Sequence, residues 1–244
     1  MDSVENNLVP IDLKETFRFA CSPGVACFNA CCRDLNQFLY PLDILRLKNA
    51  LRISSGEFLK RYTNTHIGPR SGLPMVSLAS ADAQALTCPF VTTAGCSVYP
   101  ARPASCRIYP LVRAISRNRA TAKISERFLL LKEPHCLGFG EPREQTVRQW
   151  IKNQEVDTDH PINDMLMEII SLKRQRFPGP LDLQSRRLVY RALYDLDRFR
   201  DQISNPNFSN TFKVDPEKLA AAGTDDSVLL QIAIEWVKQV VFKL

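Results

Sequence analysis

The spacing of apolar residues changes along the chain, from short mixed segments near the start to long helical segments after residue 142. Apolar residues at positions 42, 44, 45, 47 and 51 predict a helix over Pro41 to Leu51, with proline in its first turn. Ser54 and Glu57 have the spacing of a capping box, so we expect a second helix to begin there. The later helical period predicts helices over about 143–155, 161–175, 181–203 and 225–242.

Between these helical segments the pattern favours short strands and turns. Met75 to Leu78 is typical of a strand, and we expect Ala85 to Val91 to pair with it. Leu111 to Ile115 and Ala120 to Ile124 flank a short polar stretch, and they predict a second hairpin. Arg102 to Tyr109 lies between prolines and predicts a helical turn.

The last apolar stretch, Val228 to Leu244, predicts a helix that is mostly buried. Its polar residues recur at helical spacing and form a narrow stripe: Gln231, Glu235, Lys238 and Gln239. Together these patterns predict an α+β protein. We expect a loop-rich domain with short helices and hairpins over residues 1–140, and an all-helical domain or extension over residues 141–244.

Composition places the chain among ordinary globular proteins, with 244 residues, 45% of them hydrophobic and 24% charged. A chain of this length can bury a sizeable core and does not need disulfide bonds to fold. Met1 to Pro10 lacks the features of a secretory signal, and no apolar run approaches the roughly 18 residues of a membrane span. We therefore expect a cytoplasmic protein that does not enter a membrane.

The formal net charge of +6 is compatible with an acidic protein partner, which the sequence does not identify. Nucleic acid is not expected as a partner, because the most basic stretch lacks interleaved aromatic residues and is typical of a solvated hairpin. Its basic residues are Arg113, Arg117, Arg119, Lys123 and Arg127.

Cysteine distribution is the strongest chemical signal in the chain. All eight cysteines lie in the first 136 residues: Cys21, Cys27, Cys31, Cys32, Cys88, Cys96, Cys106 and Cys136. Disulfide bonds would require an oxidising compartment, for which the N-terminal sequence gives no sign. Thiolates favour zinc, copper(I) and iron-sulfur clusters. Four of them complete one zinc site or one four-iron cluster, so eight could serve two sites or one site with a reserve set.

The intervals between the cysteines favour iron-sulfur over zinc. No Cys-x2-Cys pair is present, whereas structural zinc sites are usually built on closely spaced pairs. Cys27 and Cys31 begin the Cys-x3-Cys-x2-Cys pattern of radical enzymes that use S-adenosylmethionine, but Asp34 occupies the third position. No glycine-rich nucleotide-binding turn follows a predicted strand. We expect an iron-sulfur cluster of the four-iron type, with zinc as the alternative.

Chain geometry adds an expectation about space. The Cα atoms of the adjacent Cys31 and Cys32 lie about 3.8 Å apart, and their side chains tend to diverge. One of them can therefore face a metal while its neighbour faces a second site or remains free. We expect sulfur atoms from both cysteine segments to converge, including one of this pair and at least two from the later set: Cys88, Cys96, Cys106 and Cys136.

Three stretches resemble a known family: Cys27-Phe-Asn-Ala-Cys31-Cys32-Arg33, Gly95 to Pro110, and Cys136 to Gly140. Together they are similar to the YkgJ-type cysteine-cluster family, also called CxxCxxCC, a family of zinc- or iron-chelating domains. The resemblance covers about residues 17–140. The family's Cys-x2-Cys-x2-Cys-Cys is stretched here to Cys-x5-Cys-x3-Cys-Cys, which leaves Cys21 as the least secure match. The resemblance implies a metal-binding domain with the cysteines as ligands.

Side chains beside the cysteines have supporting roles in this hypothesis. Arg33, Arg102 and Arg107 could offset the negative charge of a cluster through charge-assisted hydrogen bonds, or they could be solvated. His135 precedes Cys136 and could be a ligand or a donor to one, although a lone histidine is more often structural. Two tyrosines could form a dry shell around the site or belong to the ordinary core: Tyr99 and Tyr109.

The sequence leaves three functions open. The leading hypothesis is a module whose thiolates hold an iron-sulfur cluster for structure, electron transfer or redox sensing. The second is protein lysine N-methylation, implied by the resemblance because flagellin lysine N-methylase belongs to the same family; a shared fold alone does not establish this activity. The third is a structural zinc protein that serves as an interaction platform, with the helical half as the docking surface.

Overall fold

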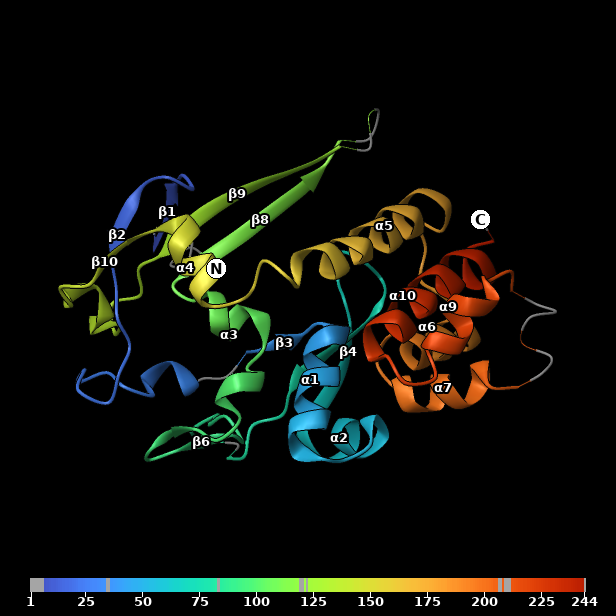
Figure 1. Ribbon diagram of the computed structural model, residues 1–244, viewed down its shortest axis with the longest axis horizontal. Coiled ribbons are helices and arrows are strands. Elements are labelled where there is room, and N and C mark those ends of the chain that lie inside the picture. The colour runs from blue at the N-terminus through green and yellow to red at the C-terminus, as the bar shows by residue number, and fades with distance from the viewer. Residues whose placement is uncertain are drawn as a thin grey trace. The chain divides into compact units, whose positions relative to one another are not determined.

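The computed structural model describes residues 7–33, 36–82, 84–118, 121, 123–205, 208 and 212–243 (Figure 1). The protein is α+β, and its long helices gather in the C-terminal half, as the sequence predicts. The chain forms two compact units. Unit 1 comprises Met1–Leu35, Ala81–Tyr99 and Pro103–Asp159, and unit 2 comprises Asn36–Ser80, Pro100–Arg102 and His160–Leu244. These units interleave along the chain, whereas the sequence led us to expect one boundary at residue 140.

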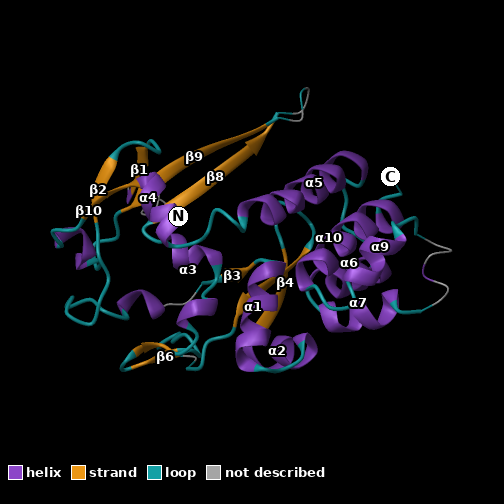
Figure 2. Ribbon diagram, in the orientation of Figure 1, coloured by secondary structure: helices purple, strands orange, loops and turns teal. Residues whose placement is uncertain are grey.

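A three-stranded antiparallel sheet of order β1-β9-β8 forms one part of unit 1 (Figure 2). Its strands are β1 (Leu8–Ile11), β8 (Leu111–Arg117) and β9 (Ile124–Leu131). The β8 and β9 strands form the hairpin that the sequence predicts, but the second strand begins at Ile124 and runs further. Ala120 and Ala122, which fall in the predicted strand, and Arg119 of the basic stretch lie outside the described residues.

A second, two-stranded sheet leads into the aromatic core of unit 1. In it β2 (Thr16–Arg18) pairs with β10 (Glu144–Thr146). Because residues 144–146 are extended, α4 (Val147–Asn153) begins later than the predicted residue 143, and the Thr146 hydroxyl accepts a hydrogen bond from the backbone N–H of Gln149 (3.1 Å). Phe17 and Phe19 pack edge-on against Trp150, with ring centroids 6.2 and 5.5 Å apart. Such edge-to-face contacts add stability beyond the area that they bury.

The short helix α3 (Ala104–Ile108) is held in unit 1 by its last two residues. The Trp150 indole donates a hydrogen bond to the Ile108 carbonyl (2.9 Å). The buried guanidinium of Arg107 forms an ion pair with the buried Asp159 and donates to the carbonyls of Gln154 and Glu155, both at 3.1 Å. This helix carries Cys106, so its anchoring bears directly on the cysteine positions.

Short turns and strands complete unit 1. They are η2 (Ala30–Cys32), β6 (Val91–Thr92), β7 (Gly95–Cys96) and η4 (Leu137–Gly140). The β6 and β7 strands pair with each other, and η3 (Tyr99–Ala101) follows them in the chain.

Unit 2 contains an antiparallel sheet of order β3-β5-β4, built from β3 (Phe38–Leu39), β4 (Thr63–Ile67) and β5 (Pro74–Leu78). The strand expected at residues 75–78 is confirmed. The expected pairing with Ala85 to Val91 is wrong, because β3 and β4 occupy both edges of β5. Residues 85–90 instead consist mainly of turns around an isolated bridge at Thr87, with Leu86 at a positive φ of 45° and Pro89 unable to donate a ladder hydrogen bond, and Val91 begins β6.

Helices account for the rest of unit 2. Helix α1 (Pro41–Leu51) has the predicted bounds, and α2 (Ser55–Tyr62) begins after Ser54, whose hydroxyl accepts from the backbone N–H of Glu57 (3.1 Å). The later helices are α5 (His160–Arg176), α6 (Leu183–Leu193), α7 (Leu196–Ile203), α9 (Pro216–Ala221), α10 (Asp226–Trp236) and the π-helical η5 (Val237–Val241). None of the helices in the described part of the chain combines the length and apolar character that a membrane crossing needs.

Two helical predictions are refined by the structure. The helix expected over 181–203 is interrupted at Tyr194 and Asp195, where the Asp195 carboxylate accepts a hydrogen bond from the Ser55 hydroxyl (2.9 Å). The narrow polar stripe of the last helix is confirmed. Its Lys238 donates to Glu168 of α5 and to Glu235, both at 2.8 Å, while the neighbouring apolar residues are buried.

Breaking the Arg107–Asp159 pair should destabilise unit 1. We expect Asp159→Asn to lower the free energy of unfolding by about 3–5 kcal/mol, because it leaves a buried guanidinium without its counter-charge. Urea unfolding followed by Trp150 fluorescence, in a Trp236→Phe background, reports on unit 1 alone. Asp157→Asn is the control, since Asp157 is exposed two residues away. Equal stability of the two variants would contradict the structural role of the pair.

Candidate metal centre

All eight cysteines lie in unit 1 and are thiols rather than disulfides. Cys31 and Cys32 belong to the turn η2, Cys96 ends the strand β7, and Cys106 is in the helix α3. The other four come from loops. Cys21 and Cys31 are exposed, and the remaining six are half-buried. Stretches far apart in the sequence therefore deliver all the candidate ligands to one unit.

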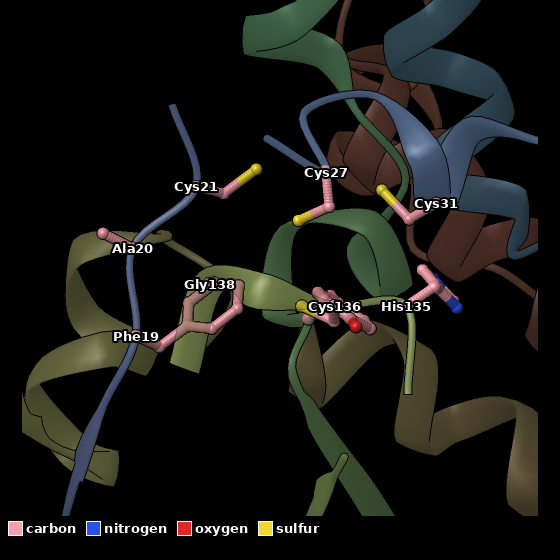
Figure 3. A pocket seen from close by; sticks show the side chains of 9 residues that line it. Phe19, Ala20, Cys21, Cys27, Cys31, His135, Cys136 and Gly138 are labelled. Atoms are coloured by element: carbon pink, nitrogen blue, oxygen red, sulfur yellow. The ribbon is translucent and has the colours of Figure 1, made fainter. Parts of the chain in front are cut away.

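Four of these residues, which we call the first cysteine group, line one cavity: Cys21, Cys27, Cys31 and Cys136 (Figure 3). The cavity has a volume of about 30 Å³ and is partly open to solvent. In Figure 3 the sulfur atoms of Cys21, Cys27 and Cys31 turn toward the space between them. Residues that complete the lining are Phe19, Ala20, Tyr109, His135 and Gly138.

Backbone contacts hold the loop around Cys136 against the N-terminal segment, at Ala20 and at Cys27. The backbone N–H of Leu137 donates to the sulfur of Cys27 (3.1 Å), and that of Ala20 donates to the carbonyl of Gly138 (3.1 Å). Gly138 is required for this approach. A Cβ at this position would lie 2.6 Å from the Ala20 carbonyl oxygen and 2.7 Å from the Phe19 ring.

Tyr109 and His135 line the same cavity. The Tyr109 hydroxyl donates to the Glu133 carboxylate (3.0 Å), and its ring packs edge-on against Phe19. Burial raises the pKa of Tyr109, and a hydrogen bond with Cys136 raises this pKa further. Tyr109 is therefore a neutral phenol that can donate hydrogen bonds beside the cysteines. His135 is about half exposed, with its Nε2 3.7 Å from a Glu133 oxygen.

The other four cysteines form what we call the second cysteine group: Cys32, Cys88, Cys96 and Cys106. A hydrogen bond with Cys31 raises the pKa of the Cys32 thiol, and burial raises it further. The nearby Cys88 and Cys106 add to this rise. Burial raises the pKa of Cys88, with a further contribution from Cys96. The backbone N–H groups of Phe90 and Val91 donate to the Cys88 sulfur and oppose this rise, because they favour its thiolate form.

Both cysteine groups meet at Cys31 and Cys32. Cys31 lines the cavity of the first group, whereas Cys32 belongs to the second group, and a hydrogen bond joins their side chains. The backbone N–H of Cys88 donates to the carbonyl of Cys32 (2.8 Å), and the Asn29 amide donates to the carbonyl of Thr92 (3.0 Å). Through these contacts the early and late cysteine segments come together, and the convergence of their sulfur atoms on one metal stays a prediction.

Candidate supporting residues occupy different surroundings. Arg107 is buried with Asp159, Arg33 is exposed, and Arg102 belongs to unit 2. A role for these arginines toward a metal stays a prediction. Tyr99 is 57% exposed, so it does not form the dry shell that we considered for it, whereas Tyr109 lines the cavity.

Sequence reasoning missed the residues that hold the cysteine loops in place. Gly138 and Asn29 act through close approach and a side-chain hydrogen bond, and Gly95 has a φ of +116° with the Phe28 ring against it. The glycines were visible in the sequence beside cysteines, but their partners are set by tertiary contacts. Within the described part of the chain, no three His, Cys, Asp or Glu side chains are arranged so that they could hold one metal ion directly.

Comparison with known families agrees with this picture. Residues 20–137 match the sequence model of the CxxCxxCC family, "Putative zinc- or iron-chelating domain". The matched segment begins one residue before Cys21 and ends one residue after Cys136, so it contains all eight cysteines. No curated protein and no solved structure matches the chain.

Adding a methyl group at Gly138 should disturb the cavity. We expect Gly138→Ala to destabilise unit 1 by about 1–3 kcal/mol, the usual cost of overpacking, and to raise the reactivity of the first-group thiols. Urea unfolding and thiol labelling with mass-spectrometric mapping measure the two effects. Gly140→Ala is the matched control, because no atom lies within 4 Å of its added Cβ. A Gly138→Ala protein as stable and as unreactive as this control would contradict the close approach.

Proposed function

We propose that this protein carries a thiolate-bound iron-sulfur cluster, because residues 20–137 match the sequence model of the CxxCxxCC family of zinc- or iron-chelating domains. The ligands of this cluster are the first cysteine group. The observation that carries the proposal is the cavity that four cysteines line, three from the N-terminal segment and Cys136 from a distant one (Figure 3). Four thiolates are the full ligand set of a four-iron cluster.

The donor atoms at the cavity suit this group. Thiolates are soft ligands, and iron-sulfur clusters are among the centres that they favour. The Leu137 N–H donates to the Cys27 sulfur, which stabilises negative charge there. The Tyr109 hydroxyl also shares a hydrogen bond with Cys136. Hydrogen bonds to ligand sulfurs also tune the reduction potential of a cluster.

Exposure of the site favours a redox role over a purely structural one. Cys21 and Cys31 are exposed, so a cluster bound by them would be accessible to an electron donor, an acceptor or an oxidant. When bound, the cluster would supply one-electron redox chemistry. The chain's own contribution is to gather the thiols, direct the Leu137 N–H at the Cys27 sulfur and line the cavity with the rings of Phe19 and Tyr109.

Metal analysis tests the proposal directly. Protein purified without oxygen should be brown and should contain iron and acid-labile sulfide in about equal amounts. Stoichiometric zinc without sulfide would overturn the iron-sulfur proposal in favour of a zinc site, which the family description also covers.

Cysteine variants test the ligand assignment. We expect Cys27→Ser/Cys136→Ser to abolish the cluster of the first group, because the pair removes half of its thiolates. The matched variant Cys88→Ser/Cys96→Ser should keep that cluster and its paramagnetic resonance signal after reduction. Iron and sulfide counts with resonance spectra make the comparison. If the second variant also loses all cluster signal, the assignment to the first group fails and the eight cysteines act as one set.

A further inference from the structure

Unit 2 contains a second cavity, whose lining is dominated by arginine. It has a volume of about 440 Å³ and is bordered by β4, β5, α6 and α7. Its lining residues are Thr65, Ile67, Pro74, Arg186, Arg187, Tyr190, Arg191, Asp195 and Arg198. This volume falls in the range of about 300–1,000 Å³ that is typical of small-molecule sites.

Two of these arginines have guanidinium groups available to a ligand. Arg187 and Arg191 are exposed and lie one turn apart on α6. Neither makes a hydrogen bond or an ion pair with any residue in the described part of the chain. Like charges at this spacing weaken a helix slightly, so an anion placed between them would relieve their repulsion.

The other charged groups of the cavity are engaged by the protein. The Nε of Arg186 donates to the Leu181 carbonyl (2.7 Å), and the Nε of Arg198 lies 3.4 Å from Asp195. Asp195 is the acidic residue of the lining, and it is buried with one oxygen bonded to the Ser55 hydroxyl (2.9 Å). This carboxylate offsets Arg198 and leaves the positive charges of Arg186, Arg187 and Arg191 uncompensated within the lining.

The cavity walls beside Arg187 and Arg191 are partly apolar, and hydrogen bonds hold them in place. Tyr190 shares a hydrogen bond with the Thr65 side chain, and the Tyr194 hydroxyl donates to the Pro74 carbonyl (3.2 Å). Ile67 is 44% exposed at the cavity edge. An aromatic ring and an aliphatic side chain beside two guanidinium groups suit an organic molecule with an anionic end.

We propose that this cavity binds a small organic phosphate, with its phosphate held by Arg187 and Arg191. Guanidinium groups pair with phosphate oxygens through two parallel hydrogen bonds, and a phosphate has enough oxygens to engage two such groups. The organic part of the ligand packs against Tyr190 and Ile67. The site is distinct from the cysteine groups, all of which belong to unit 1.

Calorimetric titration of the full-length protein with ADP, pyrophosphate and citrate at physiological salt tests the proposal. We expect saturable binding of ADP, weaker binding of pyrophosphate and no comparable binding of citrate. Arg187→Gln/Arg191→Gln should weaken ADP binding by about tenfold or more, because it removes the charge-assisted hydrogen bonds. Both residues are exposed, so the variant should keep the wild-type melting temperature.

The matched control is Arg174→Gln/Arg176→Gln, which removes the same charge from exposed positions on α5. It should bind ADP as the wild type does. The proposal is overturned if neither ADP nor pyrophosphate binds, if citrate binds as tightly as ADP, or if both double variants weaken binding equally. The last result would show that net charge, rather than this cavity, attracts the anion.

Discussion

A small set of backbone hydrogen bonds brings distant cysteine loops together, and the candidate metal centre depends on them. The Cys88 N–H binds the Cys32 carbonyl, the Leu137 N–H binds the Cys27 sulfur, and the Ala20 N–H binds the Gly138 carbonyl. The residues joined at Cys27 are separated by 110 positions. Since loop-closure entropy grows slowly with length, the aromatic core around Trp150 and these few bonds can offset it. A site gathered in this way loses less conformational entropy when it binds a ligand.

Crowding of the thiols gives the centre its electrostatic character. Neighbouring cysteines and burial raise the pKa values of Cys32 and Cys88, so protonated thiols are favoured there at neutral pH. A cation reverses this preference, because thiolates bound to metal are deprotonated. Metal binding at such a centre therefore releases protons and is favoured as the pH rises. Backbone N–H groups at the Cys88 sulfur lower its pKa and so act in the same direction as the cation.

Local signals predicted the elements of this fold better than its pairings. The proline and apolar spacing of Pro41–Leu51 gave a helix with the correct bounds, because proline and periodicity act within a few residues. The β5 strand was found, but its partners were not, since β3 is only two residues long. Similarly, the sequence identified the eight cysteines but not their division into groups. That division depends on tertiary contacts such as the close approach of Gly138 to Phe19.

Interleaving of the two units has a consequence for biosynthesis. Unit 1 needs residues up to Asp159, including the strand β10 and the helix α4 that carries Trp150. When the ribosome has released Asp159, residues 36–80 of unit 2 have already emerged. They cannot complete their unit until α5 to α10 have been synthesised. Domains usually fold as units during translation, the first one first. Here the nascent chain holds incomplete parts of both units at once, so their apolar surfaces are exposed together, and a chaperone has a long interval in which to act.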